Sequence, residues 1–142
     1  MNRLFCYGTL QVPEVIKSVT GRTYQGQTAT VRDYAIYKVK DAEYPGIIRS
    51  ADREIGGIVY DHVSDKDLKV LDLFESDLYL RQLLDVVLAD GTTCNAWCYV
   101  IRDENRSLLT NEIWRLEDFL NNGLESFMTG YVNARRDVYS TQ

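Results

Sequence analysis

The chain has 142 residues, of which 45% are hydrophobic and 26% charged, a balance typical of one globular domain with a single core. Its net charge of -5 at pH 7 excludes a general nucleic-acid binder, because such proteins need a basic surface to displace counterions. No apolar stretch reaches membrane-spanning length, and too few residues precede Tyr7 for the core of a secretory signal, so we expect a cytoplasmic protein with no membrane partner.

The first predicted element is a short buried strand that runs into a tight turn. The apolar run Leu4-Phe5-Cys6 indicates the strand, and Tyr7-Gly8-Thr9-Leu10 forms the turn. Glycine can adopt backbone angles that are closed to other residues. Successive N–H groups in such a turn can hold a carboxylate or an oxyanion, whereas a core strand with an ordinary turn is the simpler interpretation.

Strands dominate the next part of the chain. After one or two helical turns over residues 11–19, residues 23–39 predict two strands that are joined by a turn at Arg32-Asp33. The break at Tyr44-Pro45-Gly46 precedes a short strand over residues 47–50. In the strand over residues 54–63, the pair Gly56-Gly57 indicates a bulge, a close approach by another group, or a bend that closes a small barrel.

Two helices and a hairpin follow. Ser64 can cap a helix that ends near Glu75, with Asp67 close to a capping box and an apolar stripe on one face. Residues 79–88 and 93–101 predict a hairpin around an Asp-Gly turn. Residues 111–122 predict an amphipathic helix that stops at Gly123. The tail over residues 127–142 either covers the domain or packs against a partner subunit.

Cysteine and histidine content argues against metal chemistry. Cys6, Cys94 and Cys98 leave one thiol unpaired under any disulfide scheme, which favours a reducing compartment. Their spacing lacks the paired knuckles of a structural zinc site, and His62 is the only histidine. We therefore expect no metal and no cofactor. A Ser-His-Asp or Cys-His mechanism would have to use His62 as its base.

Glu75 is the strongest candidate for catalysis. It follows Phe74 at the apolar end of the predicted helix, where partial burial and the negative end of the helix dipole would both raise its pKa. A carboxyl group in such a place can act as a general acid and base near neutral pH. The alternative is a solvated glutamate at a helix terminus, since most carboxylates are exposed.

Several motifs occur in an order that resembles the γ-glutamylcyclotransferase family, including its AIG2-like branch. The resemblance runs from the first strand to the second helix and does not cover the tail after Gly123. Its most specific parts are the Tyr-Gly-Thr-Leu turn and the Phe-Glu pair that is followed by Tyr-x-Arg. The motifs are Phe5-Cys6-Tyr7-Gly8-Thr9-Leu10, Tyr44-Pro45-Gly46, Gly57-Ile58-Val59-Tyr60, Leu71-Asp72-Leu73-Phe74-Glu75 and Tyr79-Leu80-Arg81.

The resemblance implies an α+β fold, a small mixed β-barrel with flanking helices, over residues 1–126. Members of the family cyclise a γ-glutamyl amino acid or γ-glutamyl amine to 5-oxoproline and release the free amine, without a cofactor. By position, Glu75 matches the acid/base residue. The groups that would hold the substrate are the backbone of Tyr7, Gly8, Thr9 and Leu10, together with the side chains of Tyr79 and Arg81.

Two residues leave alternatives open within this resemblance. Arg81 could contact the substrate or pair with Asp77 or Asp85 outside the pocket. Many members have Phe-Glu-Gly where this chain has Ser76 after Glu75, a change that affects how the carboxylate is aimed and which substrates fit.

The expected function is that of a cytoplasmic γ-glutamylcyclotransferase-like enzyme, an amide-cleaving cyclising acyltransferase or lyase. Its expected partners are a small γ-glutamyl substrate and, through the tail, a second copy of the chain. The alternative is a non-catalytic protein that has kept the pocket and binds a small carboxylate metabolite there.

Overall fold

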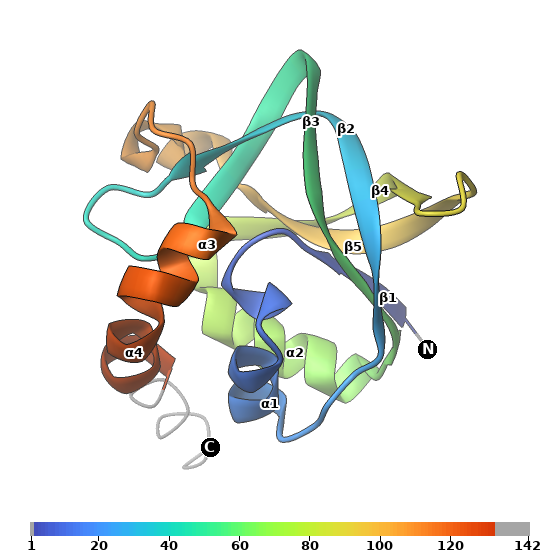
Figure 1. The fold of residues 1–142 in the computed structure, drawn as a ribbon, viewed down its shortest axis with the longest axis horizontal. Helices are drawn as coiled ribbons and strands as arrows, with labels where there is room; N and C mark the ends of the chain where they lie inside the picture. Colours follow the sequence, from blue (N-terminus) through green and yellow to red (C-terminus); the bar gives the residue numbers. More distant parts are fainter. Residues whose placement is uncertain (1, 133–142) are drawn as a thin grey trace.

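Five strands close into a barrel in the computed structural model, which describes residues 2–132 (Figure 1). Around the barrel the order is β1-β3-β2-β4-β5; β1 pairs in parallel with β5, and the other strand pairs are antiparallel. The predicted α+β barrel with flanking helices is confirmed. The strands are β1 (Asn2–Cys6), β2 (Gly26–Lys38), β3 (Pro45–Val63), β4 (Tyr79–Leu88) and β5 (Thr93–Ile101).

The helices gather at one end of the barrel, where α1, α2 and α4 lie together in Figure 1. Pro13 stands in the first turn of α1, where its missing N–H costs little, and Gly21 ends the helix with a φ of 79°. The α-helices are α1 (Pro13–Thr20), α2 (Asp65–Glu75), α3 (Leu116–Asp118) and α4 (Leu124–Phe127). The 3-10 turns cover Thr9–Gln11, Ser76–Leu78 and Asp103–Leu108, and π-helical turns cover Phe119–Gly123 and Met128–Val132.

Strand β1 supplies side chains to two cores because successive strand residues point to opposite faces. Phe5 belongs to the cluster inside the barrel, together with Tyr7 from the turn that follows. Leu4 and Cys6 belong to the cluster between the barrel and the helices. The predicted first strand is thus confirmed as a core element, and the turn that follows it starts at the junction of the two cores.

Strands β2 and β3 are each longer than the sequence predicts. The predicted turn at Arg32-Asp33 is wrong: β2 continues through a bulge, where Asp33 has a φ of 66°. The Asp33 carboxylate accepts a hydrogen bond of 3.2 Å from the backbone N–H of Asp52, whose own φ is 65°. β2 and β3 thus bend together at Asp33 and Asp52, and the predicted strands over residues 47–50 and 54–63 form the single strand β3.

The two adjacent glycines of β3 have different surroundings. A Cβ atom at Gly57 would overlap the carbonyl oxygen of Cys6 and lie 2.8 Å from Cζ of Phe5, whereas one at Gly56 would meet nothing within 4 Å. Of the three alternatives that the sequence leaves open for Gly56-Gly57, the close approach of another group therefore applies to Gly57.

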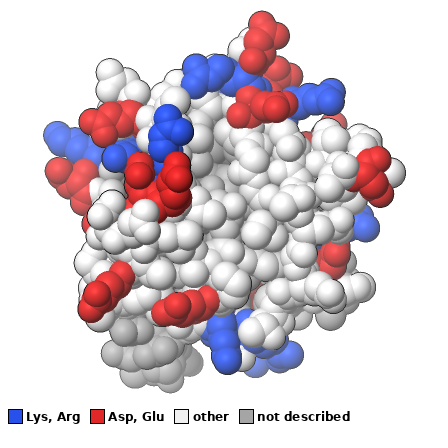
Figure 2. Space-filling view, viewed as in Figure 1, with Lys and Arg blue, Asp and Glu red and all other residues white. Residues whose placement is uncertain are grey.

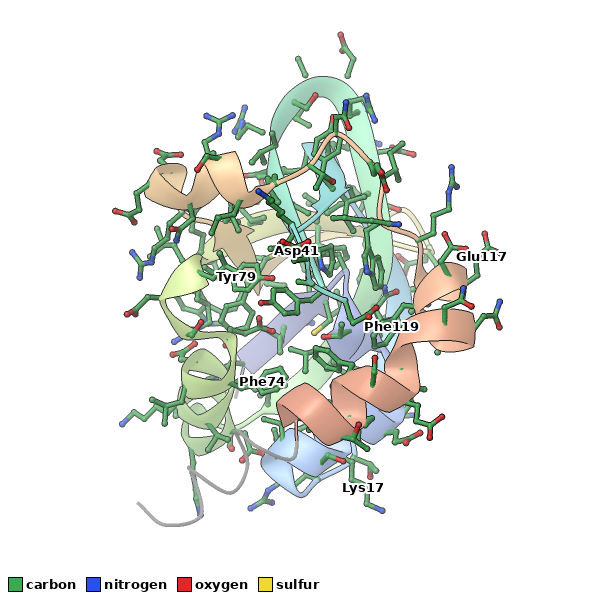
Figure 3. All side chains as sticks on the ribbon, turned by 90° about the vertical axis from the view of Figure 1, so that its left-hand side faces the viewer. Lys17, Asp41, Phe74, Tyr79, Glu117 and Phe119 are labelled. Carbon is green, nitrogen blue, oxygen red and sulfur yellow. The ribbon has the colours of Figure 1, made fainter. Side chains whose placement is uncertain are left out.

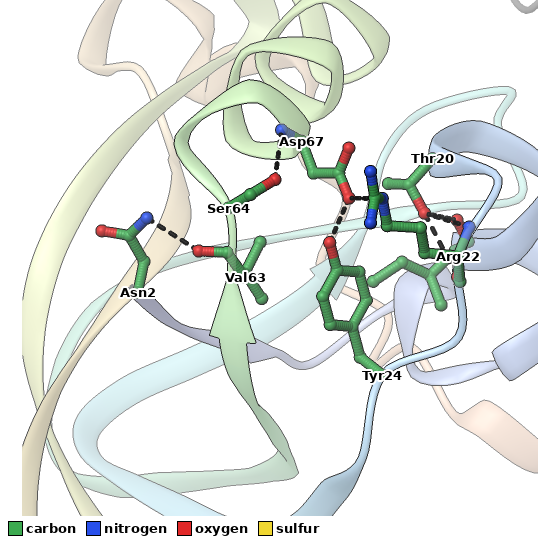
Figure 4. A network of polar contacts seen from close by, with 8 residues as sticks. Asn2, Thr20, Arg22, Tyr24, Val63, Ser64 and Asp67 are labelled. Atoms are coloured by element: carbon green, nitrogen blue, oxygen red, sulfur yellow. Dashed lines mark hydrogen bonds and ion pairs between the residues drawn. The ribbon is translucent and has the colours of Figure 1, made fainter.

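Ser64 caps the N-terminus of α2 as predicted, but the side chain of Asp67 binds residues outside the helix. The Ser64 hydroxyl oxygen accepts a hydrogen bond of 3.1 Å from the N–H of Asp67. The buried Asp67 carboxylate in turn accepts a hydrogen bond from the Tyr24 hydroxyl and pairs with Arg22 at 3.3 Å (Figure 4). This network ties the segment between α1 and β2 to the start of α2. The predicted apolar stripe of α2, Leu68, Leu71 and Phe74, is buried in the core.

The predicted helix over residues 111–122 is wrong in both bounds. Residues 109–115 are not helical, because they form hydrogen bonds with the segment around residue 40: Thr110 N–H donates to Lys38 O at 2.8 Å, and Lys38 N–H donates to Glu112 O at 2.9 Å. Helical structure begins at Leu116. It continues past Gly123, whose φ of -116° does not end it. Of the predicted tail, residues 133–142 lie outside the described part, and oligomerisation through it stays a prediction.

The surface drawn in Figure 2 carries its acidic and basic side chains mainly around the edge and leaves uncharged residues in the middle. None of the described helices has the length and apolar character needed to cross a membrane.

Candidate active site

One pocket brings together residues that are far apart in the sequence. It is narrow, with a cavity volume of about 30 Å³. It lies between the turn after β1, the segment that leads into β3, the end of α2, and residues of β4 and β5. The lining residues are Cys6, Tyr7, Gly8, Thr9, Leu10, Tyr44, Pro45, Glu75, Tyr79 and Tyr99.

Close packing explains the glycine of the turn after β1. Gly8 has a φ of -120° and a ψ of -134°, a combination outside the α and β regions that other residues prefer, as predicted for this turn. A Cβ atom there would lie 2.8 Å from Cγ and 2.9 Å from Cδ of Pro45. Glycine is thus required because the Pro45 ring approaches the backbone of the turn from the opposite wall of the pocket.

The carbonyl groups of the turn are occupied, whereas several of its amides are available. Gln11 N–H donates to Gly8 O at 3.1 Å, and the Gln11 side chain donates to Tyr7 O at 2.8 Å. Within the described residues, no backbone carbonyl accepts a hydrogen bond from the amides of Gly8, Thr9 or Leu10. Because these N–H groups belong to pocket-lining residues, they can serve an anionic group of a ligand.

Glu75 supplies the pocket with a carboxylate at the last residue of α2. Among the described residues that line the pocket, it is the only one with an acidic or basic side chain. Burial is the main cause that raises the pKa of Cys6 and of Tyr7, and the negative charge of Glu75 adds to the increase. The same two causes raise the pKa of Tyr99. These neighbours are therefore neutral near pH 7, and Glu75 supplies the carboxylate among the lining residues.

Three tyrosine rings form much of the pocket wall, and each hydroxyl donates to the protein. Tyr7 donates to the backbone oxygen of Tyr99 at 2.5 Å, and Tyr79 donates to that of Pro45 at 2.5 Å. The hydroxyl of Tyr99 donates to Oδ1 of Asp72 at 2.7 Å. With their protons engaged in this way, the three rings act as fixed walls and bring their apolar faces to a ligand.

The structure places Arg81 outside the residues that line this pocket. Its guanidinium binds the carboxylate of Asp72 at 2.8 Å and 3.2 Å and lies 4.4 Å from the ring centre of Trp97. The ion-pair partner is thus neither Asp77 nor Asp85, the two that the sequence suggests. Because Asp72 also holds the Tyr99 hydroxyl, Arg81 contacts a residue that supports the pocket wall.

Ser76, directly after Glu75, has a φ of 65° and a ψ of -168°. Residues other than glycine rarely adopt such a positive φ. The backbone at this position therefore favours the glycine that many members of the γ-glutamylcyclotransferase family have there. The serine therefore holds the end of α2 in a strained conformation next to the candidate catalytic carboxylate.

The sequence predicts six of the ten lining residues as site residues: Tyr7, Gly8, Thr9, Leu10, Glu75 and Tyr79. Four others were missed as site residues. Cys6 appears as a core residue, which it is, with 4% of its surface exposed. Tyr44 and Pro45 belong to one of the family motifs, but the sequence analysis interprets them only as a break before a strand. Tyr99 gives no local signal, because only the pairing of β5 with its neighbours brings it to the pocket.

No set of three His, Cys, Asp or Glu side chains within residues 2–132 is arranged to hold a metal ion. The three cysteines are free thiols.

Comparison with known proteins identifies relatives for most of the chain. A family model described as gamma-glutamyl cyclotransferase, AIG2-like, matches residues 4–116. AIG2-like protein C of Arabidopsis thaliana is 30% identical over 127 residues, which make up 89% of this chain and 73% of that protein. The chain spans a smaller share, from 51% to 66%, of the other curated relatives that it matches.

Solved structures share the fold. A solution structure of a protein from Arabidopsis thaliana matches with a TM-score of 0.71 and 26% identity, covering 94% of this chain and 81% of that one. A structure described as gamma-glutamyl cyclotransferase matches with a TM-score of 0.64, covering 71% of this chain and 66% of that one. At 18% identity, the second similarity shows the fold alone.

Proposed function

The chain belongs to the AIG2-like γ-glutamyl cyclotransferase family, and we propose that it cyclises the γ-glutamyl group of a small amide to 5-oxoproline and releases the free amine. The observation that carries this proposal is the pocket in which the turn amides and the Glu75 carboxylate line the same space. The proposal covers γ-glutamyl amino acids and γ-glutamyl amines alike.

The reaction needs one proton-transfer group, and Glu75 can supply it. The Glu75 carboxylate takes a proton from the α-ammonium of the substrate, and the freed amine attacks the γ-carbonyl carbon of the same molecule. A carbon–nitrogen bond forms, and the five-membered ring closes. Glu75 then passes its proton to the leaving nitrogen, whose bond to the carbon breaks as the tetrahedral intermediate collapses. The freed carboxylate takes the second proton of the attacking nitrogen and passes it to the released amine, so the products are 5-oxoproline and the ammonium form of the amine.

Positioning supplies much of the rate, because both reacting groups belong to one molecule. The amides of Gly8, Thr9 and Leu10 are the available donors for the substrate carboxylate or for the negative charge that develops on the γ-carbonyl oxygen. The rings of Tyr79 and Tyr99 limit the pocket on the side of the sheet and favour a folded glutamyl chain.

The direct test is the release of 5-oxoproline by the purified protein and by its Glu75→Gln variant. Glutamine keeps the size of the side chain and removes its basicity, so we expect a loss of kcat by at least about 100-fold, in line with general acid–base contributions. Asp77→Asn is the matched control, because Asp77 is an exposed acidic residue two positions away and does not line the pocket.

Circular dichroism and the urea midpoint should show that both variants are folded. Full activity of Glu75→Gln would remove the proposed role of this residue. If the wild-type protein binds γ-glutamyl compounds or 5-oxoproline in calorimetry but turns none of them over, the protein is a binding module and the catalytic proposal fails.

A further inference from the structure

The C-terminal helical segment, residues 116–132, packs against the pocket from behind. It consists of α3, α4 and two π-helical turns that follow one another without a break. All but its first residue lies beyond the part of the chain that the family model matches. Phe119 and Phe127 attach it to the core, with 3% and 2% of their surfaces exposed. Figure 3 shows Phe119 directed toward the inside of the molecule, while Glu117 points outward.

Phe127 connects two walls of the pocket. Its ring lies 6.2 Å from that of Tyr44 at an interplanar angle of 65°, and 6.2 Å from that of Phe74 at 86°. Tyr44 lines the pocket, and Phe74 directly precedes Glu75. One buried side chain outside the matched region therefore contacts a wall residue and the neighbour of the candidate catalytic residue.

The backbone that carries Tyr44 is fixed from several sides. The indole of Trp114 donates to Glu43 O at 2.9 Å, and Val39 N–H donates to Tyr44 O at 3.2 Å. On the other side of Tyr44, the Pro45 carbonyl accepts the Tyr79 hydroxyl. With the backbone held in this way, the position of the Tyr44 ring depends on what packs behind it.

Exposure identifies the mouth of the pocket. Eight of the ten lining residues are buried, and the two that are partly exposed are Tyr44 and Glu75. In the proposed reaction the buried turn of Gly8, Thr9 and Leu10 holds the glutamyl group, so the leaving group lies at the mouth and meets the Tyr44 ring.

We propose that Phe127 is a positioning residue that fixes the Tyr44 ring at the pocket mouth and thereby limits the size of the leaving amine. This inference rests on the proposed function. Phe127 occupies the space behind the ring, so Tyr44 cannot retreat from the mouth without displacing a buried aromatic side chain. The C-terminal segment thus sets substrate size.

The test compares two substrates that share the glutamyl group: γ-glutamyl methylamide with a small leaving amine, and γ-glutamyl anilide with a bulky one. Phe127→Leu keeps an apolar side chain and removes the ring contact. We expect the ratio of kcat/KM for anilide over methylamide to rise roughly three- to tenfold in this variant, chiefly through KM. Leu120→Ala is the control, because Leu120 lies on the same segment and is 46% exposed.

A double-mutant cycle separates positioning from general destabilisation. In a Tyr44→Ala background, Phe127→Leu should no longer change the ratio, because the ring through which it acts is gone. An unchanged ratio in Phe127→Leu, or an equal change in both backgrounds, would overturn the inference.

Ring motion decides the inference even if the wild-type protein releases no 5-oxoproline, a result that would sink the proposed function by itself. The ring of Phe127 packs against that of Tyr44, so the rate at which the Tyr44 ring flips, measured by NMR, reports on this contact. Phe127→Leu should speed the flipping of the Tyr44 ring relative to that of the Tyr79 ring, and Leu120→Ala should not. Equal flip rates in the two variants would show that Phe127 does not fix the Tyr44 ring.

Discussion

Replacing Gly57 by alanine should destabilise the barrel next to the pocket, and Gly56→Ala provides a matched control one residue away. A Cβ atom at position 57 would overlap the Cys6 carbonyl oxygen and lie 2.8 Å from Cζ of Phe5. One at position 56 would meet nothing within 4 Å. Neither glycine has a positive φ, so the two substitutions differ mainly in the space that is available.

The magnitude follows from these surroundings. Alanine in an unhindered strand position is favoured over glycine by about 0.5–1 kcal/mol, so Gly56→Ala should be neutral or slightly stabilising. An overpacked methyl group costs about 1–3 kcal/mol, and more where backbone must move, as it must at the Cys6 carbonyl. The two variants should therefore differ by about 2–4 kcal/mol in the free energy of unfolding.

Urea unfolding followed by the fluorescence of Trp97 and Trp114 measures this difference, which corresponds to a shift of about 1–2 M in midpoint. Relief of the overlap would move the end of β1 away from β3, and Cys6 directly precedes the turn that lines the pocket. Gly57→Ala should therefore also release 5-oxoproline more slowly than Gly56→Ala. Equal midpoints in the two variants would refute the packing argument.

Four further results are expected. Ser76→Gly should raise the free energy of unfolding by about 1 kcal/mol in urea titrations, because glycine relieves the positive φ; no gain would mean that the serine is not strained. Asp67→Asn should lower the free energy of unfolding by about 1–3 kcal/mol, because the hydrogen bond and ion pair to a buried charge are lost. An unchanged urea midpoint would contradict this. Burial raises the pKa of the Cys6 and Cys98 thiols, so the folded state keeps protons that the unfolded chain loses near the ordinary pKa of 9.0. Stability should accordingly be constant below about pH 8 and decrease as the pH rises above 9, and iodoacetamide should label the partly exposed Cys94 first; a flat profile or equal labelling would contradict this.

Half of the candidate site could be predicted from the sequence because it is local. The apolar run before Tyr7 and the glycine after it indicate a strand and a turn, and the capped helix that ends at Glu75 places a carboxylate at an apolar helix end. Arg81 shows the limit of such reasoning. Strand alternation cannot distinguish among acidic partners on other elements, and the actual partner, Asp72, lies on α2.

The longer elements depended on contacts between distant segments. A polar pair such as Arg32-Asp33 suits either a turn or a bulge, and the hydrogen bond from Asp52 across the sheet selects the bulge. Residues 111–122 have the spacing of an amphipathic helix, yet residues 109–115 pair with the chain around Lys38. The helix therefore begins only at Leu116.

Propensity, capping and strand alternation act over a few residues, so they encode the short-range features: the first strand and its turn, the cap at Ser64, the hairpin, and Glu75 at the end of a helix. What faces Glu75 depends on contacts between distant segments. Barrel closure carries Tyr99 to the pocket, the Pro45 ring explains Gly8, and Phe127 packs behind Tyr44. These contacts join segments that are distant in the chain, so no local pattern encodes them.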